Sequence, residues 1–186
     1  MTGKKIRVGL DFDGVVAYNP FRIIRAPIKW FKREVLGITR LSFFVPKNEF
    51  EKIMWSIVHE SSIFPAVGVA TLREMARDPR YEFHLITARF GFLKNNLEGW
   101  LDRYRVRELF KSINVNEGNE QPHEYKLRII KKLNLDYYVE DNLDIVMYVK
   151  DQVKTKIFWI YNFMDKRHNF PNKFPYLEGA LKMIRK

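Results

Sequence analysis

The sequence contains no cysteine. This absence excludes disulfide bonds, a thiolate nucleophile and a thiolate zinc site. No apolar run approaches the roughly 18 residues that a membrane-spanning helix needs, so we expect no membrane partner. Two lysines near the N-terminus precede an apolar run that aspartates interrupt, which argues against a signal peptide. Together these absences favour a cytoplasmic location.

Three familiar catalytic and phosphate-binding patterns are also missing. The chain has no G-x-x-x-x-G-K-[ST], no G-x-G-x-x-G and no G-x-S-x-G, so we expect neither a P-loop, a dinucleotide-binding loop nor a nucleophile elbow. Lysine and arginine number 33 against 22 acidic residues, giving a formal charge of +11. A basic surface favours anionic partners such as phosphorylated metabolites or nucleic acid. The alternative is a basic surface that is merely solvated.

Segments of strand and helix character alternate over most of the chain. The predicted strands are Ile6–Leu10, Tyr81–Thr87, Ser112–Asn116, Asp136–Glu140 and Lys156–Asn162. Apolar residues at helical spacing predict a helix from Leu93 to Tyr104, and Pro122 in a first turn predicts another up to Leu133. This alternation predicts an α/β fold: a Rossmann-like parallel sheet with helices on both faces.

One segment, residues 17–64, interrupts this alternation with no convincing strand. Asn48 and Glu51 form a capping box ahead of an apolar stripe from Phe50 to Val58, and Ile28–Val35 carries a second stripe. We therefore expect a small helical cap inserted after the first strand. The predicted division is an α/β core of residues 1–16 and 65–186, with the cap at 17–64.

Three of the predicted strands end in chemically unusual residues. The first strand ends in Asp11 and Asp13, the second in Thr87 and Arg89, and the fourth in Glu140 and Asp141. Lys126 lies in the first turns of the helix before that fourth strand. In open parallel sheets, ligands bind outside the carboxyl ends of the strands, so these side chains should converge on one edge.

Carboxylates, a hydroxyl and a lysine at one edge suit phosphoryl transfer through aspartate. One aspartate can attack phosphorus and form an aspartyl-phosphate, while a second protonates the leaving oxygen and then activates water. Paired buried carboxylates repel each other, so a cation and the lysine are expected to offset them. Mg²⁺ prefers carboxylate, carbonyl and water oxygens.

Four motifs in order, D-F-D-G-V-V, L-I-T-A-R, a lysine and V-E-D-N, resemble those of the haloacid dehalogenase (HAD) superfamily of phosphohydrolases. The match runs from Ile6 to Ile145, and the predicted insertion lies where this superfamily places its helical cap of the first type. With the later W-I-Y-N-F, the second and fourth motifs look most like the 5'-nucleotidase and 5'(3')-deoxyribonucleotidase branch. The resemblance implies a Mg²⁺-dependent phosphomonoester hydrolase that acts through an aspartyl-phosphate.

Carried over by position, the resemblance makes Asp11 the nucleophile and Asp13 the general acid and base. It assigns Mg²⁺ to the Asp11 carboxylate, the Asp13 backbone carbonyl and the Asp141 carboxylate. Glu140 is implied as a second-shell or alternative acidic position, and Asp144 as a weaker alternative.

The same resemblance makes Thr87 a ligand of the phosphoryl group and Lys126 its link to the nucleophile. Arg89 is implied as an assisting contact to phosphate or substrate. The alternatives are that Thr87 is only a β-branched strand residue and that Lys126 belongs to a charged helix face. We expect His84 to be a satisfied core histidine and Phe12 to point into the core.

The expected partner is a small phosphorylated substrate, with a nucleotide favoured by the resemblance and nucleic acid not excluded. The alternatives are a phosphatase of sugar phosphates, a phosphatase of nucleic-acid termini, and a non-enzymatic phosphate-binding protein with a HAD fold. Oligomeric state cannot be read from the sequence.

Overall fold

A computed structural model describes residues 4–19, 46, 48–60 and 62–186 of the chain. Its strands are β1 (Ile6–Asp11), β2 (Ala17–Tyr18), β3 (Phe64–Pro65), β4 (Tyr81–Phe90), β5 (Ser112–Asn116), β6 (Tyr137–Glu140), β7 (Lys156–Ile160) and β8 (Lys173–Phe174). Its helices are α2 (Glu49–Glu60), α3 (Val69–Ala76), α4 (Lys94–Arg103), α5 (Pro122–Leu133), α6 (Leu143–Val149) and α7 (Leu177–Arg185).

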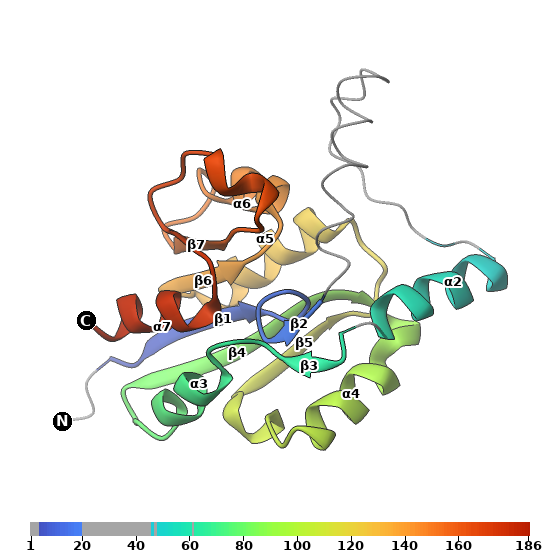
Figure 1. Cartoon of the computed structure of the whole chain (residues 1–186), viewed down its shortest axis with the longest axis horizontal. Helices are drawn as coiled ribbons and strands as arrows, with labels where there is room; N and C mark the ends of the chain where they lie inside the picture. The colour runs from blue at the N-terminus through green and yellow to red at the C-terminus, as the bar shows by residue number, and fades with distance from the viewer. Residues whose placement is uncertain (1–3, 20–45, 47, 61) are drawn as a thin grey trace.

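The main sheet has six strands in the order β5-β4-β1-β6-β7-β8, and every neighbouring pair is parallel. The first strand lies centrally, so Asp11 is opposite Ile86 of β4 and Leu10 is opposite Val139 of β6. The carboxyl ends of β1, β4 and β6 therefore meet at one edge, where the predicted motifs follow them. The predicted α/β fold with a Rossmann-like parallel sheet is confirmed (Figure 1).

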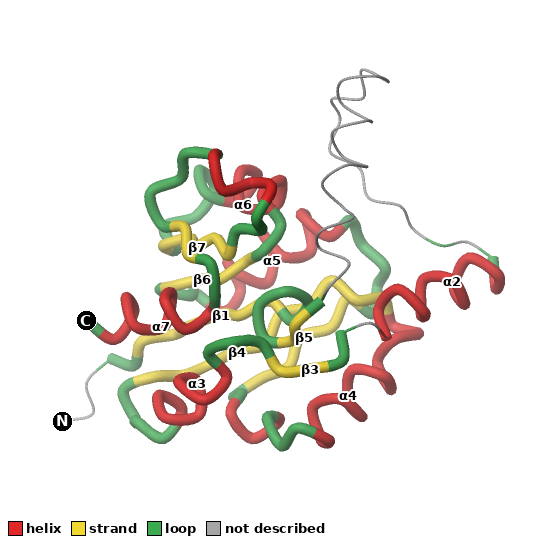
Figure 2. The backbone as a smooth tube through the Cα atoms, viewed as in Figure 1, coloured by secondary structure: helices red, strands yellow, loops and turns green. Residues whose placement is uncertain are grey.

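Helices cover both faces of this sheet and create two apolar cores (Figure 2). One core packs α3, α4 and α7 against side chains such as Leu10 and Phe158, and the other packs α5 and α6 against side chains such as Tyr138 and Trp159. Successive strand residues alternate between the two cores, as the pleat of a strand buried on both faces requires. None of the helices in the described residues has the length and apolar character needed to cross a membrane.

The predicted elements of the core agree with the structure apart from their ends. Strand β4 runs three residues further than predicted, to Phe90, and β7 ends two residues earlier, at Ile160. Helix α5 begins at Pro122, as the proline predicted, and ends at Leu133 before Asn134, which adopts a left-handed conformation. The structure adds α3, α6, α7 and β8, for which no prediction was made.

The predicted cap segment begins and ends in a short antiparallel pair, β2 with β3, where no strand was expected. Its capping box is confirmed: the Glu51 N–H donates to Asn48 Oδ1 at 2.8 Å, and the Asn48 N–H donates to Glu51 Oε2 at 3.4 Å. The stripe of α2 starts with Phe50 and Ile53, which are 73% and 59% exposed. The second predicted stripe, Ile28–Val35, lies outside the described residues, so the division into core and cap stays a prediction.

Candidate active site

The turn after β1 separates the two motif aspartates from the phenylalanine between them. Phe12 is fully buried in the core and meets Trp100 edge to face at 4.9 Å, as predicted. Gly14 has φ 84°, a left-handed conformation that glycine adopts at little cost. The N–H groups of Val16 and Ala17 donate to the Phe12 carbonyl and tighten the turn. This local structure fixes Asp11 and Asp13 at the edge of the sheet.

Lys126 joins the nucleophile position to β6. Its Nζ lies 2.9 Å from Asp11 Oδ1 and 2.7 Å from Glu140 Oε2, and all three residues are almost fully buried. The first turns of α5 deliver the lysine to the point where β1 and β6 end side by side. Lys126 is thus part of a buried ion-pair network, and the alternative of a charged helix face is wrong.

Glu140 is held by further donors in addition to Lys126. The Tyr138 hydroxyl donates to its Oε2 at 2.8 Å, and the Asn142 N–H donates to its Oε1 at 3.0 Å. Asn142 also caps the N-terminus of α6, because its side chain accepts from the Asp144 N–H. With both oxygens engaged by protein donors, Glu140 is best placed to hold Lys126 in position.

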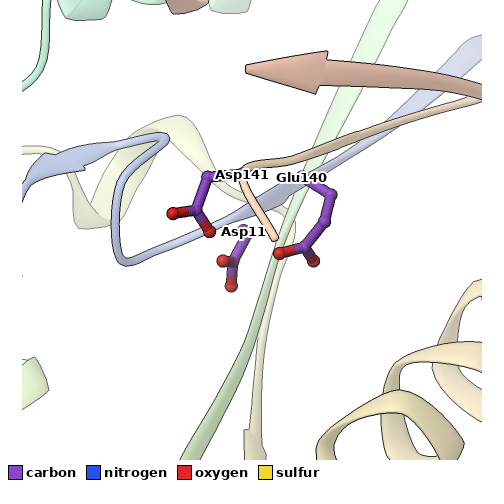
Figure 3. A group of neighbouring side chains, drawn as sticks. All are labelled: Asp11, Glu140 and Asp141. Carbon is purple, nitrogen blue, oxygen red and sulfur yellow. The ribbon is translucent and has the colours of Figure 1, made fainter. Parts of the chain in front are cut away.

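Three carboxylates converge at this edge: Asp11 from the end of β1, and Glu140 and Asp141 from the end of β6 (Figure 3). One oxygen from each lies within 4.8 Å of the others. A set of hard oxygen donors at this spacing suits Mg²⁺. The backbone carbonyl of Asp141 accepts from Trp159 Nε1 at 3.1 Å, which fixes the chain just behind its carboxylate. Asp144 lies outside this cluster in the described part of the chain.

The electrostatics of the cluster are unbalanced. Burial raises the pKa of Asp11 well above its ordinary value, and the charge of Glu140 adds to this while Lys126 opposes it. Burial alone would lower the pKa of Lys126, but the carboxylates of Asp11 and Glu140 raise it. Burial alone would raise the pKa of Glu140, but Lys126 lowers it. Lys126 and Glu140 therefore form an ion pair, and Asp11 is the group on which a further positive charge would act.

The Asp13 side chain lies in a different set of contacts. Arg89 donates to it twice, from Nε to Oδ2 at 2.9 Å and from Nη2 to Oδ1 at 2.7 Å. The Ser62 hydroxyl, which follows α2, donates to Oδ1 at 2.6 Å. Arg89 was expected to contact phosphate or substrate, yet its charged group faces Asp13 here.

Thr87 is buried near the carboxyl end of β4. Its Oγ1 accepts from the Arg89 backbone N–H at 3.2 Å, which orients the hydroxyl. The hydroxyl hydrogen can then donate to a phosphoryl oxygen. The structure thus brings the predicted residues to one edge of the sheet, and their roles in binding and catalysis stay predictions.

Comparisons with known proteins agree with this fold. No protein-family model matches the chain, and no curated protein matches its sequence. Solved structures do match: a candidate beta-phosphoglucomutase from Thermotoga maritima has a TM-score of 0.60 at 16% identity and covers 97% of this chain and 98% of its own. A candidate haloacid dehalogenase-like hydrolase from Bacteroides fragilis has a TM-score of 0.60 at 11% identity and covers 95% of this chain and 99% of its own.

The chain therefore has the HAD fold. A third neighbour with this fold, the candidate HAD-hydrolase YfnB from Bacillus subtilis, has a TM-score of 0.56 at 10% identity and covers 98% of this chain and 100% of its own. That structure was determined with bound magnesium. The neighbours do not confirm the 5'-nucleotidase branch that the motifs resemble.

Three residues around the site were not predicted: Ser62, Asn96 and Tyr138. Asn96 accepts from Arg89 Nη1 at 2.7 Å, and the other two contact Asp13 and Glu140 as described. Tyr138 carried a usable signal, because it is two residues before Glu140 and faces the same side of the strand. Ser62 and Asn96 are polar residues at a loop and on a helix surface, and nothing in their spacing distinguishes them.

Proposed function

We propose that this protein is a Mg²⁺-dependent phosphomonoester hydrolase that acts through an aspartyl-phosphate on Asp11. The observation that carries the proposal is the contact of Lys126 with both Asp11 and Glu140, beside Asp141, at the carboxyl edge of a HAD-fold sheet. A buried ammonium between two carboxylates fixes the nucleophile and adds positive charge where a phosphoryl group would arrive.

In the first half of the reaction, an Asp11 carboxylate oxygen attacks phosphorus and the ester P–O bond breaks. The departing oxygen keeps the bonding electron pair and takes a proton from Asp13, which has to be in its acid form for this step although its pairing with Arg89 favours the carboxylate. In the second half, Asp13 accepts a proton from a water that attacks the same phosphorus. Phosphate leaves, Asp11 becomes a carboxylate again, and Asp13 regains its proton.

Asp11 and Asp141 are the side chains proposed to hold Mg²⁺, together with the Asp13 backbone carbonyl. With all groups ionised, the three carboxylates and one ammonium of the cluster carry a formal charge of −2, which one divalent ion would neutralise. The ion would supply charge neutralisation for the incoming phosphoryl group. Lys126 and Thr87 would hold the phosphoryl oxygens from the protein side.

For the substrate class, the motif resemblance supports a nucleoside monophosphate. A second candidate, a sugar phosphate, is supported by the similarity to a candidate beta-phosphoglucomutase. The formal charge of +11 suits either anion and keeps nucleic-acid termini as a further candidate.

The test is a panel of phosphomonoesters assayed with and without Mg²⁺: nucleoside monophosphates, sugar phosphates, 5'-phosphorylated oligonucleotides and p-nitrophenyl phosphate. We expect Mg²⁺-dependent phosphate release, fastest from a nucleoside monophosphate. Sugar phosphates hydrolysed much faster than nucleotides would overturn the substrate class alone. Phosphate binding without hydrolysis of any ester would overturn the enzymatic proposal.

A further inference from the structure

Arg89 is fixed on all sides by protein groups. Its Nε and Nη2 donate to the two oxygens of Asp13, and its Nη1 donates to Asn96 Oδ1 at 2.7 Å. The guanidinium carbon also lies 4.6 Å from the centre of the Phe12 ring, and only 1% of the side chain is exposed. An arginine held in this way has little freedom to turn toward a substrate.

The geometry of the pair is the reason to assign it a role. Two parallel N–H···O bonds between a guanidinium and a carboxylate fix the plane of the carboxylate as well as its distance. Ser62 adds a third donor from the chain segment that returns from the predicted cap. The carboxylate of Asp13 is therefore oriented by the core through Arg89 and contacted by the insertion through Ser62.

We propose that Arg89 is a positioning residue: it holds the Asp13 carboxylate in the orientation for proton exchange with the leaving oxygen and does not bind the substrate phosphate. This inference rests on the proposed function. A proton must pass between Asp13 and the ester oxygen over one hydrogen bond, and a misplaced carboxylate loses the rate of that step. Arg89 acts through Asp13 and touches no reacting atom.

Two variants keep the positive charge while loosening the orientation. Arg89→Lys replaces the fork with a single ammonium, and Asn96→Ala removes the contact that fixes Arg89 from α4. The matched control is Arg80→Lys. Arg80 forms a similar fork with Asp78, from Nε to Oδ1 and from Nη2 to Oδ2, but just before β4 begins and at the surface, where its side chain is 69% exposed.

The readout is the dependence on the leaving group under single-turnover conditions, with enzyme in excess over ester. p-Nitrophenol leaves without needing a proton, whereas the alcohol of AMP or glucose 6-phosphate leaves slowly unless it is protonated. We expect Arg89→Lys to slow cleavage of the faster alkyl ester by at least about tenfold, and to change p-nitrophenol release and KM by less than about threefold. Asn96→Ala should show a smaller loss with the same selectivity, and Arg80→Lys should match the wild type.

A tenfold rise in KM for both esters with kcat retained would make Arg89 a phosphate ligand and overturn the proposal. Equal losses of kcat for both esters would overturn it too, because general damage does not distinguish leaving groups. If the wild type cleaves no ester, the proposed function fails separately. The crystal structure of Arg89→Lys then still decides: we expect a rotated Asp13 carboxylate, and an unchanged carboxylate overturns the inference.

Discussion

Asp11 and Asp13 are two residues apart at the end of one strand, yet their carboxylates lie in opposite electrostatic surroundings. Asp11 shares one lysine with Glu140 and lies beside Asp141, so negative charge is in excess. Asp13 has an arginine bound to both of its oxygens and a serine hydroxyl in addition. Phe12, the residue between them, is fully buried in the core.

The contrast separates two tasks that a phosphoryl-transfer site must perform. A site with excess negative charge attracts a cation and is strained without one, since like charges in a buried place repel. A charge-balanced, rigid pair gives a defined orientation instead. Asp11 is therefore suited to chemistry beside a metal ion, and Asp13 to proton exchange at a fixed position.

The largest effect should come from changing the nucleophile itself. Asp11→Asn removes the oxygen nucleophile, because an amide cannot form the aspartyl-phosphate, and we expect turnover to fall to background. The measurement is phosphate release from the best ester of the panel. Asp102→Asn is the control, since that aspartate lies on α4 with its side chain 64% exposed. Near-normal turnover by Asp11→Asn would remove the distinction between the two aspartates.

The two aspartates should also have opposite effects on stability in the absence of metal. Asp13→Asn leaves the Arg89 guanidinium buried without its ionised partner, which costs about 3–5 kcal/mol and lowers Tm by about 6–20 °C. Asp11→Asn removes a carboxylate whose ionised form the fold disfavours, so we expect a Tm a few degrees above that of the wild type.

The expected rise in Tm for Asp11→Asn follows from the raised pKa of Asp11. The folded state holds the Asp11 proton more tightly than the unfolded state does, so this group costs stability as pH rises above the ordinary carboxyl pKa of about 3.9. An asparagine has no such cost at neutral pH. The measurement is thermal unfolding with chelator present, and a shift of both variants in the same direction would contradict the comparison.

Magnesium should stabilise the protein through the Asp11 cluster. An ion that binds only the folded state adds about 2.7 kcal/mol at 100 times its Kd, which corresponds to about 5–10 °C in Tm for a chain of this size. Asp141→Asn should reduce this shift strongly. Asp144→Asn is the matched control because Asp144 lies outside the carboxylate cluster. If Asp144→Asn lost the shift and Asp141→Asn kept it, the ligand would have to be reassigned.

Much of the fold could be predicted because periodicity is a local property. Buried parallel strands such as β1 show short apolar runs, and Pro122 marks the start of α5 directly. The strands β2 and β3 were missed because two residues carry no period. Helix α7 has apolar residues at helical spacing and was predictable, although no prediction was made for it.

The site was predictable as a set of residues but not as a set of contacts. Parallel strands bring their carboxyl ends together, so motif residues such as Asp11 and Glu140 had to lie at one edge. The sequence could not show that Arg89 turns toward Asp13. That direction depends on Phe12 beneath the guanidinium and on Asn96 from α4, which are contacts between elements far apart in the chain.

The smallest expected effect concerns His84, a buried polar residue of β4 outside the carboxylate cluster. As predicted, it is a satisfied core histidine: its Nδ1 lies 2.8 Å from Ser112 Oγ and its Nε2 lies 3.2 Å from Glu82 Oε1. Burial lowers the pKa of His84, and Glu82 opposes this only in part. The folded state therefore releases the His84 proton more readily than the unfolded state, whose histidine pKa is about 6.5.

Stability contributed by neutral His84 is present above pH of about 6.5 and decreases as pH falls toward the lower pKa of the folded state. We expect the wild type to lose Tm between neutral pH and about pH 5.5, and His84→Gln to lose a few degrees less over the same range. Turnover at neutral pH should be unchanged in the variant, because this network lies toward the middle of β4, away from the carboxyl edge. Equal pH dependence in both proteins would show that His84 does not titrate differently on folding. A loss of turnover comparable to that of Arg89→Lys would instead extend the site along β4 and weaken the distinction between its balanced and unbalanced parts.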